Sequence, residues 1–70
     1  MPTNSERVAR AKTAVEAHAR ACQDDYDGLP MSEMVSDLLA NLHHLADAEA
    51  IDWKAVAEYA TRHYLDERAK

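Results

Sequence analysis

The sequence predicts an all-α fold, a three-helix domain whose second and third helices form an antiparallel hairpin. Three observations lead to this prediction. Ala is abundant and Phe is absent, a bias that favours helix over strand. A single Gly and two Pro leave few places for turns. Apolar residues recur every three or four positions in three stretches, which is the period of amphipathic helices.

The first helix is expected over about residues 5–22. Thr3 and Glu6 have the spacing of a capping box at its start. Its apolar stripe is narrow and consists of Val8, Ala11, Val15, His18, Ala19 and Cys22. Such a stripe packs closely on a neighbour but cannot anchor a core alone. We therefore expect this helix to lie across the other two or to pack on a second copy of the chain, with Cys22 buried as a small hydrophobe.

An acidic loop over residues 23–30 separates the first helix from the second. Gly28 supplies the freedom that a turn needs, and Pro30 suits the start of a helix. The second helix, expected over about residues 31–48, has the widest apolar face of the three. This face consists of Met31, Met34, Val35, Leu38, Leu39, Leu42, Leu45 and Ala46. Its width allows contact with two other helices.

The third helix is expected over about residues 53–68. Asp52 is a favourable N-cap, and Ile51 and Val56 have the spacing of a hydrophobic staple. One face carries Trp53, Val56, Ala57, Tyr59, Ala60, His63 and Tyr64. Large apolar residues are few outside the second helix, and a chain of 70 residues buries only a modest core. We therefore expect a homodimer.

Charge is distributed unevenly along the chain. The net charge is −5, and residues 24–52 hold eight acidic residues and no basic one. A negative surface repels nucleic acid and favours a basic partner. We therefore expect a non-enzymatic interaction or accessory protein that binds a basic protein, such as one that handles nucleic acid. The expected partner-binding residues are Asp24, Asp25, Asp27, Glu33, Asp37 and Asp47.

The region of His43, His44 and Asp47 offers an alternative, a metal-binding or metal-dependent hydrolase domain. His43 and Asp47 lie one helical turn apart and could chelate one ion. A zinc site needs three or four ligands. His63 could supply a further ligand. However, we expect His63 on the buried face of the third helix and His44 on the solvent-exposed face of the second. We therefore predict neither a metal nor another cofactor.

A second alternative is a small DNA-binding regulator. Phosphate contacts dominate the affinity of such proteins and require local positive charge. The bases available to supply that charge in the first helix are Arg7, Arg10, Lys12 and Arg20. The acidic middle of the chain opposes this function, and nucleic acid is therefore not the expected partner.

The segment Met31–Asp47, followed by Ile51-Asp52-Trp53 and by Arg62-His63-Tyr64, resembles small uncharacterised all-helical proteins of phages, plasmids and other mobile elements. The resemblance implies a compact helical accessory protein in a bacterial cytoplasm, and it implies no activity. The lone thiol of Cys22 fits a reducing compartment. No apolar run approaches the length of a membrane span, and the first residues lack the pattern of a signal peptide. We expect a cytoplasmic protein without membrane contact.

Overall fold

A computed structural model describes residues 2–22 and 28–69 of the chain. It holds three helices, α1 (Asn4–Ala21), α2 (Met31–Ala48) and α3 (Trp53–Arg68). Within the described residues there is no strand, so the all-α, three-helix class predicted from the sequence is confirmed. The expected and observed helix bounds differ by one residue at most.

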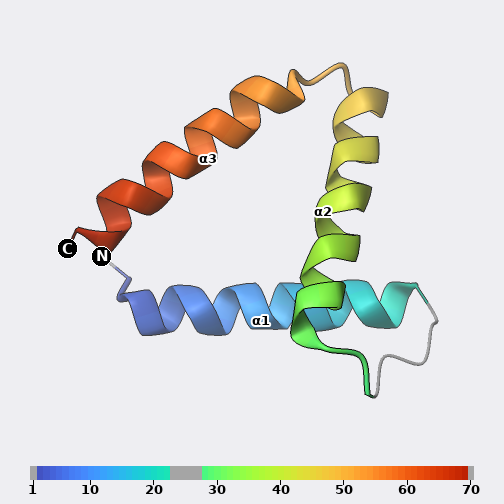
Figure 1. The fold of residues 1–70 in the computed structure, drawn as a ribbon, viewed down its shortest axis with the longest axis horizontal. Helices are drawn as coiled ribbons and strands as arrows, with labels where there is room; N and C mark the ends of the chain where they lie inside the picture. Colours follow the sequence, from blue (N-terminus) through green and yellow to red (C-terminus); the bar gives the residue numbers. More distant parts are fainter. Residues whose placement is uncertain (1, 23–27, 70) are drawn as a thin grey trace.

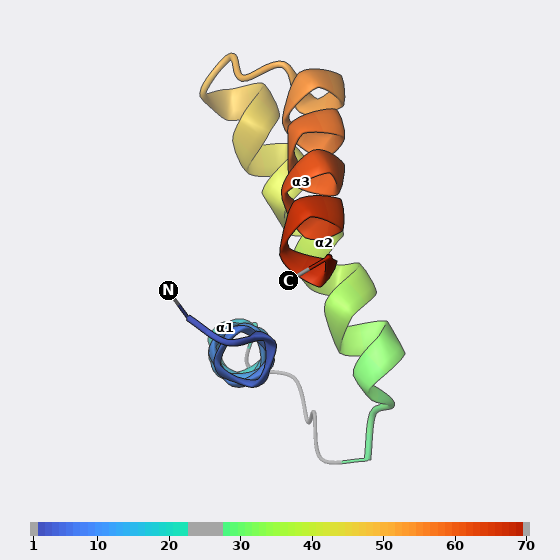
Figure 2. The same cartoon turned by 90° about the vertical axis from the view of Figure 1, so that its left-hand side faces the viewer.

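The three helices form the sides of a triangle (Figure 1). α1 crosses α2, α2 turns sharply into α3, and the C-terminal end of α3 returns to the N-terminal end of α1. A view turned by 90° shows the molecule on its narrow side (Figure 2), and the extents are 36 × 32 × 17 Å. The radius of gyration is 13.6 Å, whereas a compact domain of this length has about 11 Å. The fold is therefore open.

α2 and α3 diverge from their connecting turn (Figure 1). The chain changes direction at this turn, but the predicted antiparallel hairpin of α2 and α3 is not confirmed. Ala46 is the only described residue of α2 that is buried, and no described residue of α3 is. The two helices therefore meet through a small side chain near the turn and separate towards their other ends.

The turn between α2 and α3 has a backbone conformation that is unusual for its residues. The Ile51 N–H donates to the Ala46 carbonyl at 2.8 Å, and the Ala50 N–H donates to the Asp47 carbonyl at 3.3 Å. This pair of bonds defines a Schellman motif, which normally has glycine in the left-handed position. Here Ala50 occupies that position with φ 55°. Asp52 then caps α3, as predicted, by accepting from the Ala55 N–H at 3.2 Å.

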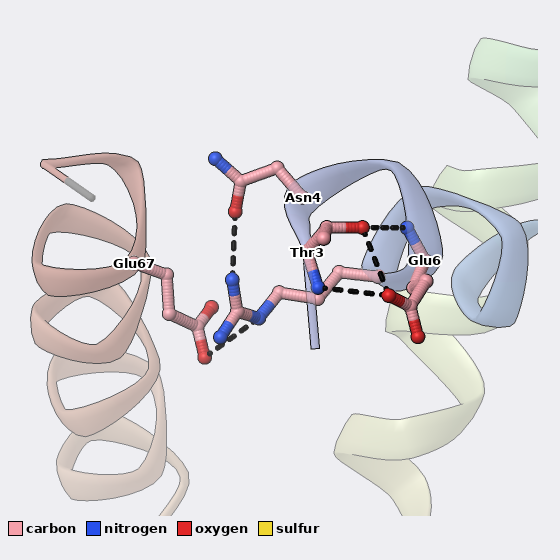
Figure 3. Close-up of polar contacts among 5 residues, drawn as sticks. Thr3, Asn4, Glu6 and Glu67 are labelled. Atoms are coloured by element: carbon pink, nitrogen blue, oxygen red, sulfur yellow. Dashed lines mark hydrogen bonds and ion pairs between the residues drawn. The ribbon is translucent and has the colours of Figure 1, made fainter. Parts of the chain in front are cut away.

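The start of α1 has the predicted capping box (Figure 3). The Thr3 hydroxyl accepts from the Glu6 N–H at 3.2 Å, and Glu6 Oε1 accepts from the Thr3 N–H at 3.3 Å. Beside it, Arg7 Nη1 donates to Asn4 Oδ1 at 2.7 Å, and Arg7 Nε lies 3.5 Å from Glu67 Oε2 of α3. This ion pair closes the third corner of the triangle. Exposed ion pairs contribute little, about 0–1 kcal/mol.

The core is very small. Among the described residues, only Val15, Ala19 and Ala46 are buried apolar residues. The predicted burial of Cys22 and His63 is wrong, because both side chains are exposed. Val15 and Ala19 mark the section of α1 that packs on α2, and Cys22 follows the end of that helix. His63 lies in the half of α3 that has separated from α2.

Candidate interaction surface

An apolar groove runs between α2 and α3, with a volume of about 440 Å³. Both helices contribute to its walls, and Ile51 of the connecting turn closes one end. The residues that line it are Leu39, Leu42, Leu45, Ala46, Ile51, Trp53, Val56, Ala57 and Ala60. None of them carries a charge.

Helical periodicity explains why so many apolar residues meet in this groove. Leu39, Leu42 and Ala46 follow one another at intervals of three and four residues on α2, as do Trp53, Val56 and Ala60 on α3. Residues at these intervals share one face of a helix. The apolar faces predicted for the second and third helices therefore line the same groove. The helical pattern did not indicate that this groove would remain uncovered.

The leucines of the groove are unusually accessible to water. Leu39 is 50 % exposed, Leu42 40 % and Leu45 53 %. Full burial of one such side chain contributes about 1.5–3 kcal/mol. Met31 and Val35 continue the exposed stripe towards the start of α2. Covering this surface would therefore release several kcal/mol, far more than the few polar contacts within the triangle supply.

The whole chain exposes more surface than a compact protein of its size. Its accessible surface is 5737 Å². A compact protein of 7.8 kDa exposes about 4,400 Å². The excess of about 1,300 Å² per chain is surface that a compact fold of this size would bury.

An aromatic pair at the rim of the groove is relevant to the alternative function of metal binding, because one of its rings belongs to His43. The His43 imidazole stacks on the Trp53 indole, with ring centroids 4.6 Å apart and planes 11° apart. No group of three or more potential metal-ligating side chains occurs among residues 2–22 and 28–69. His44 and Asp47 are exposed on α2, and Glu49 is the C-cap of that helix. His43 therefore has a packing role at the edge of the groove.

The acidic residues predicted to bind a partner fall into two groups. Three of them, Asp24, Asp25 and Asp27, lie outside the described residues. Glu33, Asp37 and Asp47 are exposed on α2, and in the described part of the chain the one ion pair joins Arg7 to Glu67. Helical spacing places the three acids away from the leucine stripe. The described part of α2 thus has an apolar side and an acidic side.

The bases of the DNA-binding alternative do not form a stripe. Arg7 is engaged by Glu67, whereas Arg10, Lys12 and Arg20 are exposed along α1. At 100° per residue, these four side chains point in widely different directions around the helix. A phosphate backbone contacts one face of a helix, so this arrangement does not concentrate positive charge where a nucleic acid would bind.

A cluster of His18, Asn41 and Cys22 lies at the contact between α1 and α2. Asn41 Nδ2 is 2.8 Å from His18 Nε2, and Cys22 Sγ is 3.7 Å from the same nitrogen and 3.9 Å from Nδ1. In a nucleophilic triad, the orienting group and the nucleophile bond opposite nitrogens of the imidazole. Here Asn41 occupies the nitrogen nearer the thiol. The cluster therefore joins two helices and lacks the geometry of a triad.

Comparison with known proteins gives no relative for this chain. A scan against models of protein families, a search of curated proteins and a search of solved structures each found no match. Across residues 2–22 and 28–69, none of the helices has the length and apolarity needed to cross a bilayer.

Proposed function

We propose that this chain is a non-enzymatic protein-interaction module that forms a homodimer through the α2–α3 groove. The observation that carries the proposal is the accessibility of Leu39, Leu42 and Leu45 in a groove without charged residues. Monomeric proteins rarely leave a continuous apolar surface of this extent in water.

The surface area supports a second copy of the chain as the partner. Stable interfaces bury about 800 Å² on each side, and permanent dimers bury more than that. An excess of about 1,300 Å² per chain falls in the range of permanent dimers. A groove lined by leucine, isoleucine, valine, alanine and tryptophan also matches the apolar interior of a helical bundle, which is what such dimers resemble.

We propose further that the acidic side of α2 binds a basic protein once the dimer has formed. Glu33, Asp37 and Asp47 are exposed, and the leucine stripe lies on another side of the same helix. A dimer that covers the leucines therefore leaves these carboxylates in water. Opposite charge would steer a basic partner to them, and salt would weaken that association.

Sedimentation equilibrium at several protein concentrations tests self-association. We expect a mass of twice the 7.8 kDa chain. The variant Leu42→Glu places a charge in the groove and should sediment as a monomer, because burying an unpaired carboxylate is costly. Ala40→Glu introduces the same charge at an exposed position of α2 outside the groove and should remain dimeric. A wild-type monomer at all concentrations would refute the proposal.

Binding of a lysine- and arginine-rich peptide to the immobilised protein tests the acidic side. We expect the double variant Glu33→Gln/Asp37→Asn to bind the peptide more weakly and with a smaller dependence on salt. The control Glu58→Gln removes one exposed charge from α3 and should bind like the wild type. If both variants bind equally, the acidic side of α2 is not the binding surface.

A further inference from the structure

We infer that the two copies are joined by reciprocal insertion of α2, so that the α2 of each copy lies in the groove of the other and the two α2 helices form an antiparallel seam centred on Leu42. The inference rests on the homodimer proposed above and specifies which element covers the groove. It follows from the exposed residues of each helix and from the position of the groove on α2.

The occupant of the groove has to be a helix with a long apolar stripe that its own chain leaves uncovered. On α2 the exposed large apolar residues extend along the whole helix, at Met31, Val35, Leu39, Leu42 and Leu45. They recur every three or four positions and carry no charge, so they form one continuous stripe. α2 therefore offers an apolar ridge that matches a groove lined by leucine, isoleucine, valine, alanine and tryptophan.

The other two helices fit the groove less well. On α1 the only exposed large apolar residue is Val8, and its two buried residues already pack against α2. On α3 the exposed set includes Tyr59 and Tyr64, whose hydroxyl groups need a polar partner when buried. The rings of both tyrosines are also covered in part by arginine guanidinium groups of the same helix. These helices would bring polar atoms into a groove without polar walls.

Two-fold symmetry then determines which residues of the two α2 helices lie opposite each other. The part of α2 that lines the groove extends from Leu39 to Ala46. A helix lying in the groove contacts that part, and in an isologous dimer the contacting parts of the two copies are identical. Two equivalent segments that cross antiparallel have their midpoint on the two-fold axis. Leu42 is the groove-lining residue nearest that midpoint, and Leu39 of one copy then lies near Leu45 and Ala46 of the other.

The charges of α2 are compatible with this arrangement. Glu33, Asp37 and Asp47 lie outside the groove and remain in water when the leucines are covered. An antiparallel seam also pairs the positive end of one helix dipole with the negative end of the other. Because the groove has no charged residue, salt should weaken the dimer less than it weakens binding of a basic partner by the acidic side.

The single cysteine of the chain makes a disulfide test possible. In a Cys22→Ser background, Leu42→Cys should form a covalent dimer when treated with diamide, because residues on the axis approach within the ~5.5–6 Å Cα separation of a disulfide. Ala40→Cys in the same background is the control. It lies outside the groove and should remain uncrosslinked.

The direction of the seam is tested by mixing two variants of different mass, tagged Leu39→Cys and untagged Leu45→Cys, both with Cys22→Ser. Antiparallel insertion predicts mixed disulfides of intermediate mass, whereas a parallel seam predicts only the two pure products. Circular dichroism would reveal whether Leu42→Cys folds. If it does not, the mixture of Leu39→Cys and Leu45→Cys still tests the α2 seam.

The outcomes separate the inference from the proposed function. If Cys22→Ser protein sediments as a dimer but neither Leu42→Cys nor the mixed pair crosslinks, the dimer exists and the α2 seam is wrong. If Cys22→Ser protein sediments as a monomer throughout, the homodimer itself is wrong, and the inference fails with it.

Discussion

Asn41 of α2 lies 2.8 Å from His18 of α1, measured from Nδ2 to Nε2. In the described part of the chain, this is the one side-chain hydrogen bond that joins two different helices. It lies at the corner where Val15 and Ala19 pack on α2. The angle between α1 and α2 is thus defined by one hydrogen bond and two small apolar side chains.

Removing this hydrogen bond should weaken the contact between α1 and α2. We expect Asn41→Ala to lower the free energy of unfolding by about 1 kcal/mol, a typical net value for one hydrogen bond. For a domain of this size that corresponds to a fall in Tm of about 4–8 °C. Thermal melts at a fixed protein concentration measure it. Ser36→Ala alters an exposed polar residue of the same helix and should leave Tm unchanged. Equal effects of the two variants would contradict a structural role for the Asn41 bond.

The contact between α1 and α2 should not tolerate a larger side chain. Ala19 is 8 % exposed, so Ala19→Leu has to displace α2 and should cost about 1–3 kcal/mol. Ala17 is exposed on the same helix, and Ala17→Leu makes the same chemical change without a neighbour to displace. Urea denaturation of the two variants measures the difference. The packing assigned to this corner is wrong if Ala19→Leu is as stable as Ala17→Leu.

The turn after α2 should become more stable when it receives the residue that its conformation favours. Ala50 has φ 55°, a left-handed conformation that costs a non-glycine residue about 1–2 kcal/mol. Ala50→Gly removes that cost, and after the larger entropy loss of glycine a net gain of about 0.5–1 kcal/mol is expected. Ala40→Gly, in the middle of α2, should instead lose about 1 kcal/mol. Thermal melts of both variants should therefore shift in opposite directions. A loss of stability in Ala50→Gly would mean that the turn has another conformation.

Much of the secondary structure could be predicted from local sequence patterns. The Thr3–Glu6 capping box and the Asp52 N-cap are short-range interactions, and the structure confirms both. The apolar faces of α2 and α3 also follow from helical periodicity alone. These features depend on residues within one or two helical turns of each other, which is the range that a single sequence reveals.

The arrangement of the helices could not be predicted in the same way. An apolar position shows which face of a helix avoids water, but not what covers that face. Cys22 and His63 were expected to be buried because each lies within an apolar stripe, yet both side chains remain exposed. The contact of His18 with Asn41 spans 23 positions in the sequence, and no local pattern connects the two. The candidate groove likewise depends on the divergence of α2 and α3 from their connecting turn.

The stack of His43 on Trp53 yields the final prediction. At a centroid distance of 4.6 Å and nearly parallel planes, the pair should stabilise the turn end of the groove by about 0.5–1.5 kcal/mol beyond the area it buries. We therefore expect His43→Ala to lower Tm, and His43→Phe to restore it because a phenyl ring can also stack. His44→Ala removes the neighbouring exposed imidazole and should have little effect.

The same three variants distinguish packing from metal binding. A zinc site that used His43 would make the wild type more stable with added zinc, and His43→Phe would abolish that gain because a phenyl ring cannot ligate. Packing alone predicts that the wild type and His43→Phe melt at the same temperature with and without zinc. Thermal melts with zinc and with a chelator provide the comparison. A zinc-dependent rise in Tm of the wild type that disappears in His43→Phe would overturn the packing role, since it would show that the His43 imidazole is a zinc ligand.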